Sequence, residues 1–166
     1  MIVGRRHTDR FGCLVGTDPA GPYLNAGRAP CLLAFHGFTG TTSEIRPVLD
    51  RVAERGYAVH APLLPGHGTE PGHLQDATFA HWVEGMRIEL RAAVRRHGAV
   101  VLCGFSLGSL IALELAAEAE PGVRGLVALG NAITLSPPLR AALGFFDRRA
   151  AVPDWYLLKL WSADVQ

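Results

Sequence analysis

Four short, continuous apolar runs divide the first part of the chain, and each ends at glycine, proline or a polar residue. Apolar runs of this length are typical of strands that are buried on both faces of a parallel sheet. The pattern therefore predicts strands at Cys31–Phe35, Tyr57–Leu64, Ala99–Phe105 and Gly125–Leu129. Residues 1–30 are rich in glycine, proline and polar residues, which predicts loops with a weak hairpin or edge strand.

Between these strands, apolar residues recur at helical spacing, which predicts amphipathic helices. The first helix follows Thr41 and Glu44, whose spacing is that of a capping box, and it ends at Gly56. Two further helices are predicted, from Phe79 to about Gly98 and over Leu107–Ala119. Strands that alternate with helices predict a three-layer α/β fold around a mostly parallel sheet with right-handed crossovers.

The segment Gly104-Phe105-Ser106-Leu107-Gly108 lies where a predicted strand meets a predicted helix. It matches the pattern G-x-S-x-G, in which a sharp turn strains the central serine and exposes its side chain. Gly104 and Gly108 are expected because strand and helix pass close together there. Free N–H groups at the helix start favour the negative charge that develops in acyl transfer. Ser106 is therefore the predicted nucleophile; the alternative is a surface serine in an ordinary loop.

A second glycine-rich segment, His36-Gly37-Phe38-Thr39-Gly40, directly follows the first predicted strand. In an acyl-transfer site, one oxyanion donor is the N–H of the residue after the nucleophile, here Leu107. The other comes from a loop after a neighbouring strand, which is the place of the Phe38 N–H. We therefore predict an oxyanion hole of Phe38 and Leu107, with the Phe38 ring lining the acyl pocket. The alternative is an ordinary glycine-rich loop.

Taken in order, the segments HGFTG, PLLPGHG and GFSLG resemble the carboxylesterase and monoacylglycerol-lipase branch of the α/β-hydrolases, over about residues 31–131. The resemblance implies hydrolysis of a small ester with an apolar acyl chain, without metal or organic cofactor. It assigns the nucleophile to Ser106 and the oxyanion donors to Phe38 and Leu107. Ser109 stands where the family frequently has a second glycine, and we expect it to alter only the packing at the helix start.

The general base and acid of the family's triad are absent from their expected positions. In this fold the triad runs in the order Ser, Asp or Glu, His, but all 7 histidines precede Ser106. A histidine from before Ser106 could serve as the base only through an unusual geometry. The alternative function is a non-catalytic binding domain, a pseudoenzyme. A peptidase, thioesterase or perhydrolase would carry the same motifs.

The missing late elements also define the domain organisation that we expect. Residues 1–135 are predicted to be the N-terminal part of a hydrolase core that lacks its C-terminal part, and residues 136–166 to begin a lid. The chain is then a truncated or fragmentary form with little activity. Its strand at Gly125–Leu129 becomes an exposed apolar edge, for which self-association is expected.

Charge and hydropathy restrict the partners. The 166 residues carry a net charge of +1, which gives no electrostatic reason to expect nucleic acid or an anionic membrane. Ala99–Ala117 has the length of a membrane helix, but Gly104, Ser106 and Gly108 interrupt it, so no membrane span is predicted. The charged residues of Met1–Arg10 leave no room for a secretory signal, and a cytoplasmic protein is predicted.

The histidines and cysteines lack the spacing of a metal site. His60, His67 and His73 are irregularly spaced and no cysteine or carboxylate completes a set, so no metal is predicted. His36 and His67 are instead predicted to brace loops near the site by hydrogen bonds. The cysteines within predicted strands, Cys31 and Cys103, are expected to be buried free thiols.

Overall fold

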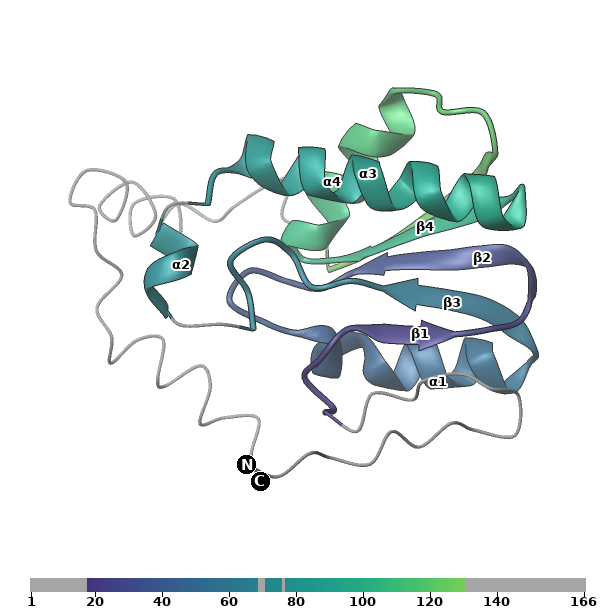
Figure 1. Ribbon diagram of the computed structural model, residues 1–166, viewed down its shortest axis with the longest axis horizontal. Coiled ribbons are helices and arrows are strands. Elements are labelled where there is room, and N and C mark those ends of the chain that lie inside the picture. Colours follow the sequence, from purple (N-terminus) through teal and green to yellow (C-terminus); the bar gives the residue numbers. More distant parts are fainter. Residues whose placement is uncertain (1–17, 69–70, 76, 131–166) are drawn as a thin grey trace.

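A computed structural model describes residues 18–68, 71–75 and 77–130 of the protein (Figure 1). Its strands are β1 (Tyr23–Asn25), β2 (Arg28–Phe35), β3 (Tyr57–Ala61), β4 (Val100–Phe105) and β5 (Val123–Leu129). They form one sheet in the order β1-β3-β2-β4-β5, in which only β1 is antiparallel to its neighbour. The predicted α/β fold with a mostly parallel sheet is confirmed.

Helices cover both faces of this sheet. They are the 3-10 turn η1 (Thr42–Ile45) and the α-helices α1 (Arg46–Glu54), α2 (Pro71–Gln75), α3 (Phe79–His97) and α4 (Leu107–Ala117). Helix α1 lies against one face, and α3 and α4 lie against the other (Figure 1). Helix α3 is bounded as its sequence predicts, because Thr78 caps its start and Gly98 ends it in a left-handed conformation with φ 73°.

Strand β2 lies inside the sheet between β3 and β4, and its last five residues are buried. Leu33 and Phe35 belong to the core beneath α3 and α4, whereas Leu32 and Ala34 belong to the core beneath α1. Successive side chains of a strand point to opposite faces, so a strand covered on both sides needs an unbroken apolar run.

The register of β2 and β4 determines which loops meet. The two strands are parallel and Phe35 pairs with Gly104, so both end at the same edge of the sheet. The loop that starts at His36 and the turn at Ser106 therefore begin side by side. Ligands of open α/β sheets bind beyond this carboxyl edge.

Strand β3 ends at Ala61, three residues before the predicted end at Leu64. Pro62 and Pro65 have no N–H to donate to a neighbouring strand. The Leu64 N–H donates to His36 Nε2 at 3.0 Å instead of joining the sheet. The following segment contains the short helix α2.

The predicted capping box at the start of the first helix is only partly present. Thr41 is the N-cap, but its side chain accepts from the Ser43 N–H. The Glu44 carboxylate reaches back to the Gly37 N–H at 3.0 Å. Glu44 thus connects the helix start to the glycine-rich loop.

Strand β5 pairs with β4 alone among the described residues. Its side chains Leu126 and Val127 are 36% and 42% exposed. The predicted end of the core at residues 131–135 and the predicted lid at 136–166 lie outside the described residues.

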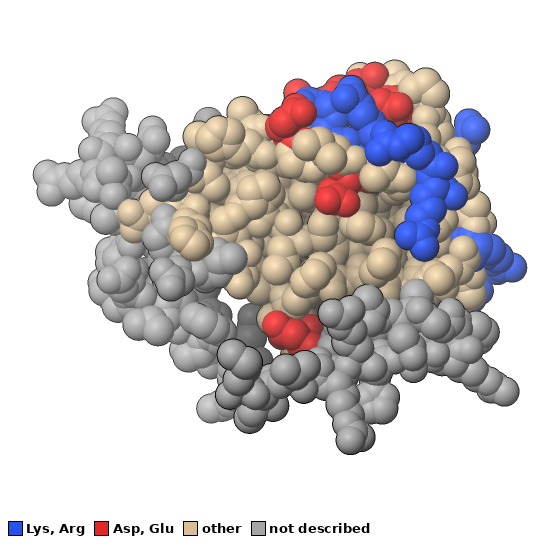
Figure 2. All heavy atoms as spheres, viewed as in Figure 1, with Lys and Arg blue, Asp and Glu red and all other residues tan. Residues whose placement is uncertain are grey.

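Charged side chains on the face shown in Figure 2 gather mainly over α3 and the end of α4. Arg87 on α3 pairs with Glu84 and with Glu118, and Arg91 pairs with Glu120. No helix in the described ranges is long and apolar enough to cross a membrane. The apolar stretch Ala99–Ala117 contains a strand and a helix, β4 and α4, on either side of Ser106.

Candidate active site

Ser106 is the single residue that separates β4 from α4. Its backbone has φ 52° and ψ −115°, a left-handed conformation that costs a non-glycine residue about 1–3 kcal/mol. The surrounding structure maintains this conformation: the Ser106 N–H donates to Leu129 O at 2.9 Å, and its carbonyl accepts from Ser109 N at 3.0 Å. The strained turn predicted from G-x-S-x-G is present.

The two glycines of the motif are sites of close backbone approach. A Cβ atom on Gly104 would lie 2.2 Å from Gly108 O, and a Cβ atom on Gly108 would lie 2.3 Å from Phe35 O and 2.6 Å from His36 O. Backbone atoms cannot move aside as a flexible side chain would. The turn and the end of β2 therefore fit together only with glycine at both positions.

Ser109 does more than the packing role expected for it. Its side chain is fully buried, and its hydroxyl donates to Gly104 O at 2.8 Å and lies 3.0 Å from Leu129 O. It thus joins the end of β4, the start of α4 and the end of β5. A glycine at this position would lack these bonds.

The Ser106 hydroxyl is half-buried and has no hydrogen-bond partner among the described residues. Leu107 is the first residue of α4, so its N–H has no acceptor within the helix. The positive end of the α4 dipole lies at the same place. The predicted nucleophile and a predicted oxyanion donor are therefore adjacent in the chain.

The loop after β2 contacts this turn directly. A methyl group on Gly37 would lie 3.5 Å from Ser106 Cβ. The next residue, Phe38, is 42% exposed, and its ring centroid lies 5.7 Å from that of Trp82 and 6.1 Å from that of His67. The structure thus brings His36–Gly40 and Ser106 together and adds Trp82, whose part in the site the sequence pattern did not indicate.

His36 braces two loops, as predicted. It is fully buried, with Nδ1 2.8 Å from Gly37 O and Nε2 accepting from Leu64 N at 3.0 Å. This pattern requires the proton on Nδ1. Burial lowers the pKa of His36 to about 4, so the ring stays neutral.

His67 braces the same region in a similar way. Its Nε2 accepts from Thr39 N at 3.1 Å, and its Nδ1 lies 3.3 Å from Pro65 O. Burial also lowers the pKa of His67. Both nitrogens of His36 and of His67 are occupied, so neither ring binds the Ser106 hydroxyl as a base would.

The remaining candidate metal ligands are held apart. His60 pairs with Glu89 on α3, with 3.1 Å between Nε2 and Oε2. His67 instead accepts a hydrogen bond from the Thr39 N–H. Within the described ranges, no three His, Cys, Asp or Glu side chains are grouped as ligands of one ion. The described cysteines, Cys31 and Cys103, are buried free thiols as predicted, and burial raises the pKa of Cys31 to about 11.

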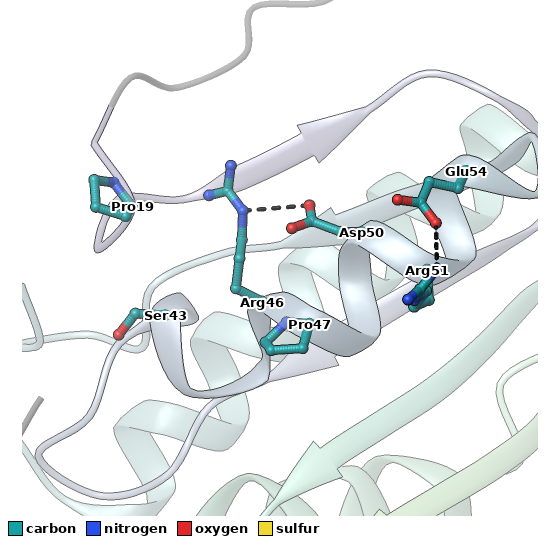
Figure 3. Close-up of a pocket in the computed structure, with 7 residues that line it drawn as sticks. All are labelled: Pro19, Ser43, Arg46, Pro47, Asp50, Arg51 and Glu54. Atoms are coloured by element: carbon teal, nitrogen blue, oxygen red, sulfur yellow. Dashed lines mark hydrogen bonds and ion pairs between the residues drawn. The ribbon is translucent and has the colours of Figure 1, made fainter.

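A surface hollow lies elsewhere, along α1 (Figure 3). It has a volume of about 500 Å³, and its lining includes Arg46 and Arg51. Both cations are already paired, Arg46 with Asp50 and Arg51 with Glu54. No predicted site residue lines this hollow, so its size does not identify it as the reaction site.

Comparison with known proteins shows the family of this chain. The family model described as serine aminopeptidase, S33, matches residues 28–162. The chain belongs to this family of α/β-hydrolases. Its strained serine and glycine-rich loop are thus features of a family member, within the branch that resembles esterases and monoacylglycerol lipases.

Several relatives within this family are named for ester hydrolysis. The thermostable monoacylglycerol lipase of Bacillus sp. strain H-257 is 32% identical over 82% of this chain and 52% of its own length. The carboxylesterase of Bacillus subtilis strain 168 is 32% identical over 57% of this chain and 39% of its own. A solved structure of the metagenome-derived lipolytic enzymes LipS and LipT has a TM-score of 0.68 at 28% identity, covering 74% of this chain and 51% of that one. The chain thus spans about half or less of the length of these relatives.

Proposed function

We propose that this chain carries the nucleophile and oxyanion site of a serine carboxylic-ester hydrolase. The observation that supports this most strongly is the strained backbone of Ser106, whose hydroxyl has no hydrogen-bond partner among the described residues and whose Cβ lies beside Gly37. Backbone strain of this kind is concentrated at functional sites. The esterase and lipase names of the relatives point to the same chemistry.

In the proposed reaction, Ser106 Oγ attacks the acyl carbon of an ester. A general base takes the hydroxyl proton as the Oγ–C bond forms, and this base is not among the described residues that contact Ser106. The N–H groups of Phe38 and Leu107 stabilise the oxyanion of the tetrahedral intermediate. The bond to the alkoxy oxygen then breaks and the alcohol leaves with the proton. Water hydrolyses the acyl-enzyme, releasing the carboxylic acid and restoring Ser106.

The proposed substrate is a small ester with an apolar acyl chain. The exposed ring of Phe38 belongs to the loop beside Ser106 and packs against Trp82 at a centroid distance of 5.7 Å. Aromatic surface of this kind favours alkyl or aryl groups over charged ones. The family description names an aminopeptidase, so amides are the matched comparison substrates.

The test combines covalent labelling of Ser106 with an assay in which added imidazole takes the place of the general base. The chain is incubated with an alkyl fluorophosphonate, and p-nitrophenyl butyrate and butyryl p-nitroanilide are assayed with and without imidazole. We expect an adduct on Ser106 and an imidazole-dependent hydrolysis of the ester, above that of Ser106→Ala. The variant Ser43→Ala, which changes a serine on η1, serves as the control and should behave as wild type.

The rival, a non-catalytic binding domain, predicts a different result. It would show no Ser106-dependent hydrolysis at any imidazole concentration. Preferred cleavage of the anilide would instead support a peptidase.

A further inference from the structure

Of three consecutive backbone N–H groups in the glycine-rich loop, the outer two donate to side chains and the middle one does not. The Gly37 N–H donates to Glu44 Oε2 at 3.0 Å. The Thr39 N–H donates to His67 Nε2 at 3.1 Å. Between them, the Phe38 N–H has no acceptor among the described residues. Of these three amides, the one without an acceptor among the described residues is thus the one assigned to the oxyanion.

We infer that Glu44 and His67 are positioning residues that hold the amides on both sides of Phe38 and leave the Phe38 N–H for the acyl oxygen. This inference rests on the proposed function. Neither side chain is itself proposed to touch the substrate. Each acts through the loop backbone.

The loop needs such support because its conformation is not a relaxed one. Thr39, a β-branched residue, has φ 61°, a left-handed conformation that is strained for any residue with a Cβ atom. A turn bond from Gly40 N to Gly37 O at 3.2 Å closes the loop on itself. The hydrogen bonds from Glu44 and His67 to the flanking amides oppose this strain.

His67 is held firmly enough to act as such a support. Its ring makes edge contacts with His36, Phe38 and Trp82, at centroid distances of 4.9, 6.1 and 5.7 Å. Its second nitrogen lies 3.3 Å from Pro65 O, and Trp82 Nε1 donates to that same carbonyl at 2.9 Å. The acceptor nitrogen is therefore fixed in both tautomer and position.

Matched variants separate the hydrogen bond from the packing. His67→Phe keeps an aromatic ring but removes the acceptor, whereas His67→Gln places an amide oxygen near the position of Nε2. Glu44→Leu and Glu44→Gln form the corresponding pair. Two readouts are taken on the full 166-residue chain: the rate of Ser106 labelling by an alkyl fluorophosphonate, and amide hydrogen exchange of Gly37 and Thr39 by NMR.

We expect His67→Phe to slow labelling about tenfold or more, because a misdirected oxyanion donor loses part of its contribution. Exchange at Thr39 should rise in this variant while Leu102 in β4 stays protected. His67→Gln should restore both values to within about threefold, and the Glu44 pair should show the same contrast at Gly37.

If His67→Phe is labelled at the wild-type rate and its Thr39 amide exchanges at the wild-type rate, the inference is overturned while the proposed function stays intact. If the wild-type chain is not labelled at Ser106, the proposed function fails. The exchange data then decide the inference: unchanged protection of Gly37 and Thr39 in the acceptor-deleted variants rejects it, and selective loss supports it.

Discussion

Gly104, Ser106 and Gly108 form a turn in which backbone atoms of strand and helix lie in direct contact. The substitution Gly108→Ala would place a Cβ atom 2.3 Å from Phe35 O, which the rigid end of β2 cannot relieve. We expect a loss of about 3 kcal/mol or more in the free energy of unfolding, measured by urea denaturation. Gly125→Ala is the matched control, because its nearest neighbour lies at 3.9 Å and a change below about 1 kcal/mol is expected. Equal stability of the two variants would contradict the close approach.

His36 makes stability depend on pH in a defined window. Its pKa is about 4 in the folded protein against 6.5 for an unperturbed histidine, because burial disfavours the charged ring. The unfolded chain therefore takes up a proton as pH falls below about 6.5, and the folded protein does so only near 4. Stability is full above this window and falls by up to about 3 kcal/mol across it.

Urea denaturation at pH 7 and pH 4.5, with an NMR titration of the His36 ring, checks this expectation. A ring that titrates at the ordinary histidine value would show that it is not buried in neutral form.

Single residues also mark the limit of what the sequence could predict at the site. Ser106, Phe38 and Leu107 follow from local motifs, because each motif fixes which strand and helix its residues join. Glu44 and His67 contact the loop from positions 7 and 28 residues further along the chain. Only the folded arrangement reveals those contacts, and Glu44 in the sequence indicated merely a helix cap.

At the scale of elements, the apolar runs predicted the ends of β2 and β4 correctly because those parts of the strands lie inside the sheet, but β2 begins at Arg28, before its apolar run. The apolar run predicts the end of β3 too late. Leu63 and Leu64 continue the run, although Pro62 already interrupts the sheet pairing. The pairing of β1 with β3 is a contact between distant segments, so the sequence indicated an edge strand without its partner.

Strand β5 is the element for which we predict self-association. Leu126 and Val127 are 36% and 42% exposed, and β5 pairs only with β4 among the described residues. An apolar strand edge of this kind pairs readily with another chain. We expect the isolated chain to form dimers or larger species in light scattering, and Leu126→Lys with Val127→Lys to shift it toward the monomer.

Val48→Lys is the control for this prediction, because Val48 is a similarly exposed apolar residue on α1, at 40%. It should leave the size distribution unchanged. A wild-type chain that is monomeric at high concentration would refute the role of the β5 edge.

At the scale of the whole molecule, the chain spans about half the length of the relatives it matches, and all 7 histidines precede Ser106. An enzyme that lacks one triad member keeps only the rate enhancement from its oxyanion hole and from substrate binding, about 10³–10⁴-fold over the reaction in water. We therefore expect residues 1–166 alone to hydrolyse p-nitrophenyl esters weakly, and Ser106→Ala to lower this rate little.

Steady-state kinetics checks the expectation of weak turnover. A kcat of about 1–10³ s⁻¹, as in ordinary enzymes, that disappears in Ser106→Ala would show that a histidine before the nucleophile serves as the base.

The most direct test of the proposed site is a crystal structure of the chain after reaction with an alkyl fluorophosphonate. The account predicts phosphorus bonded to Ser106 Oγ, the phosphoryl oxygen about 2.7–3.1 Å from both Phe38 N and Leu107 N, and the alkyl group along the Phe38 ring. Phosphorus on another residue, or a phosphoryl oxygen directed away from these two amides, would contradict it.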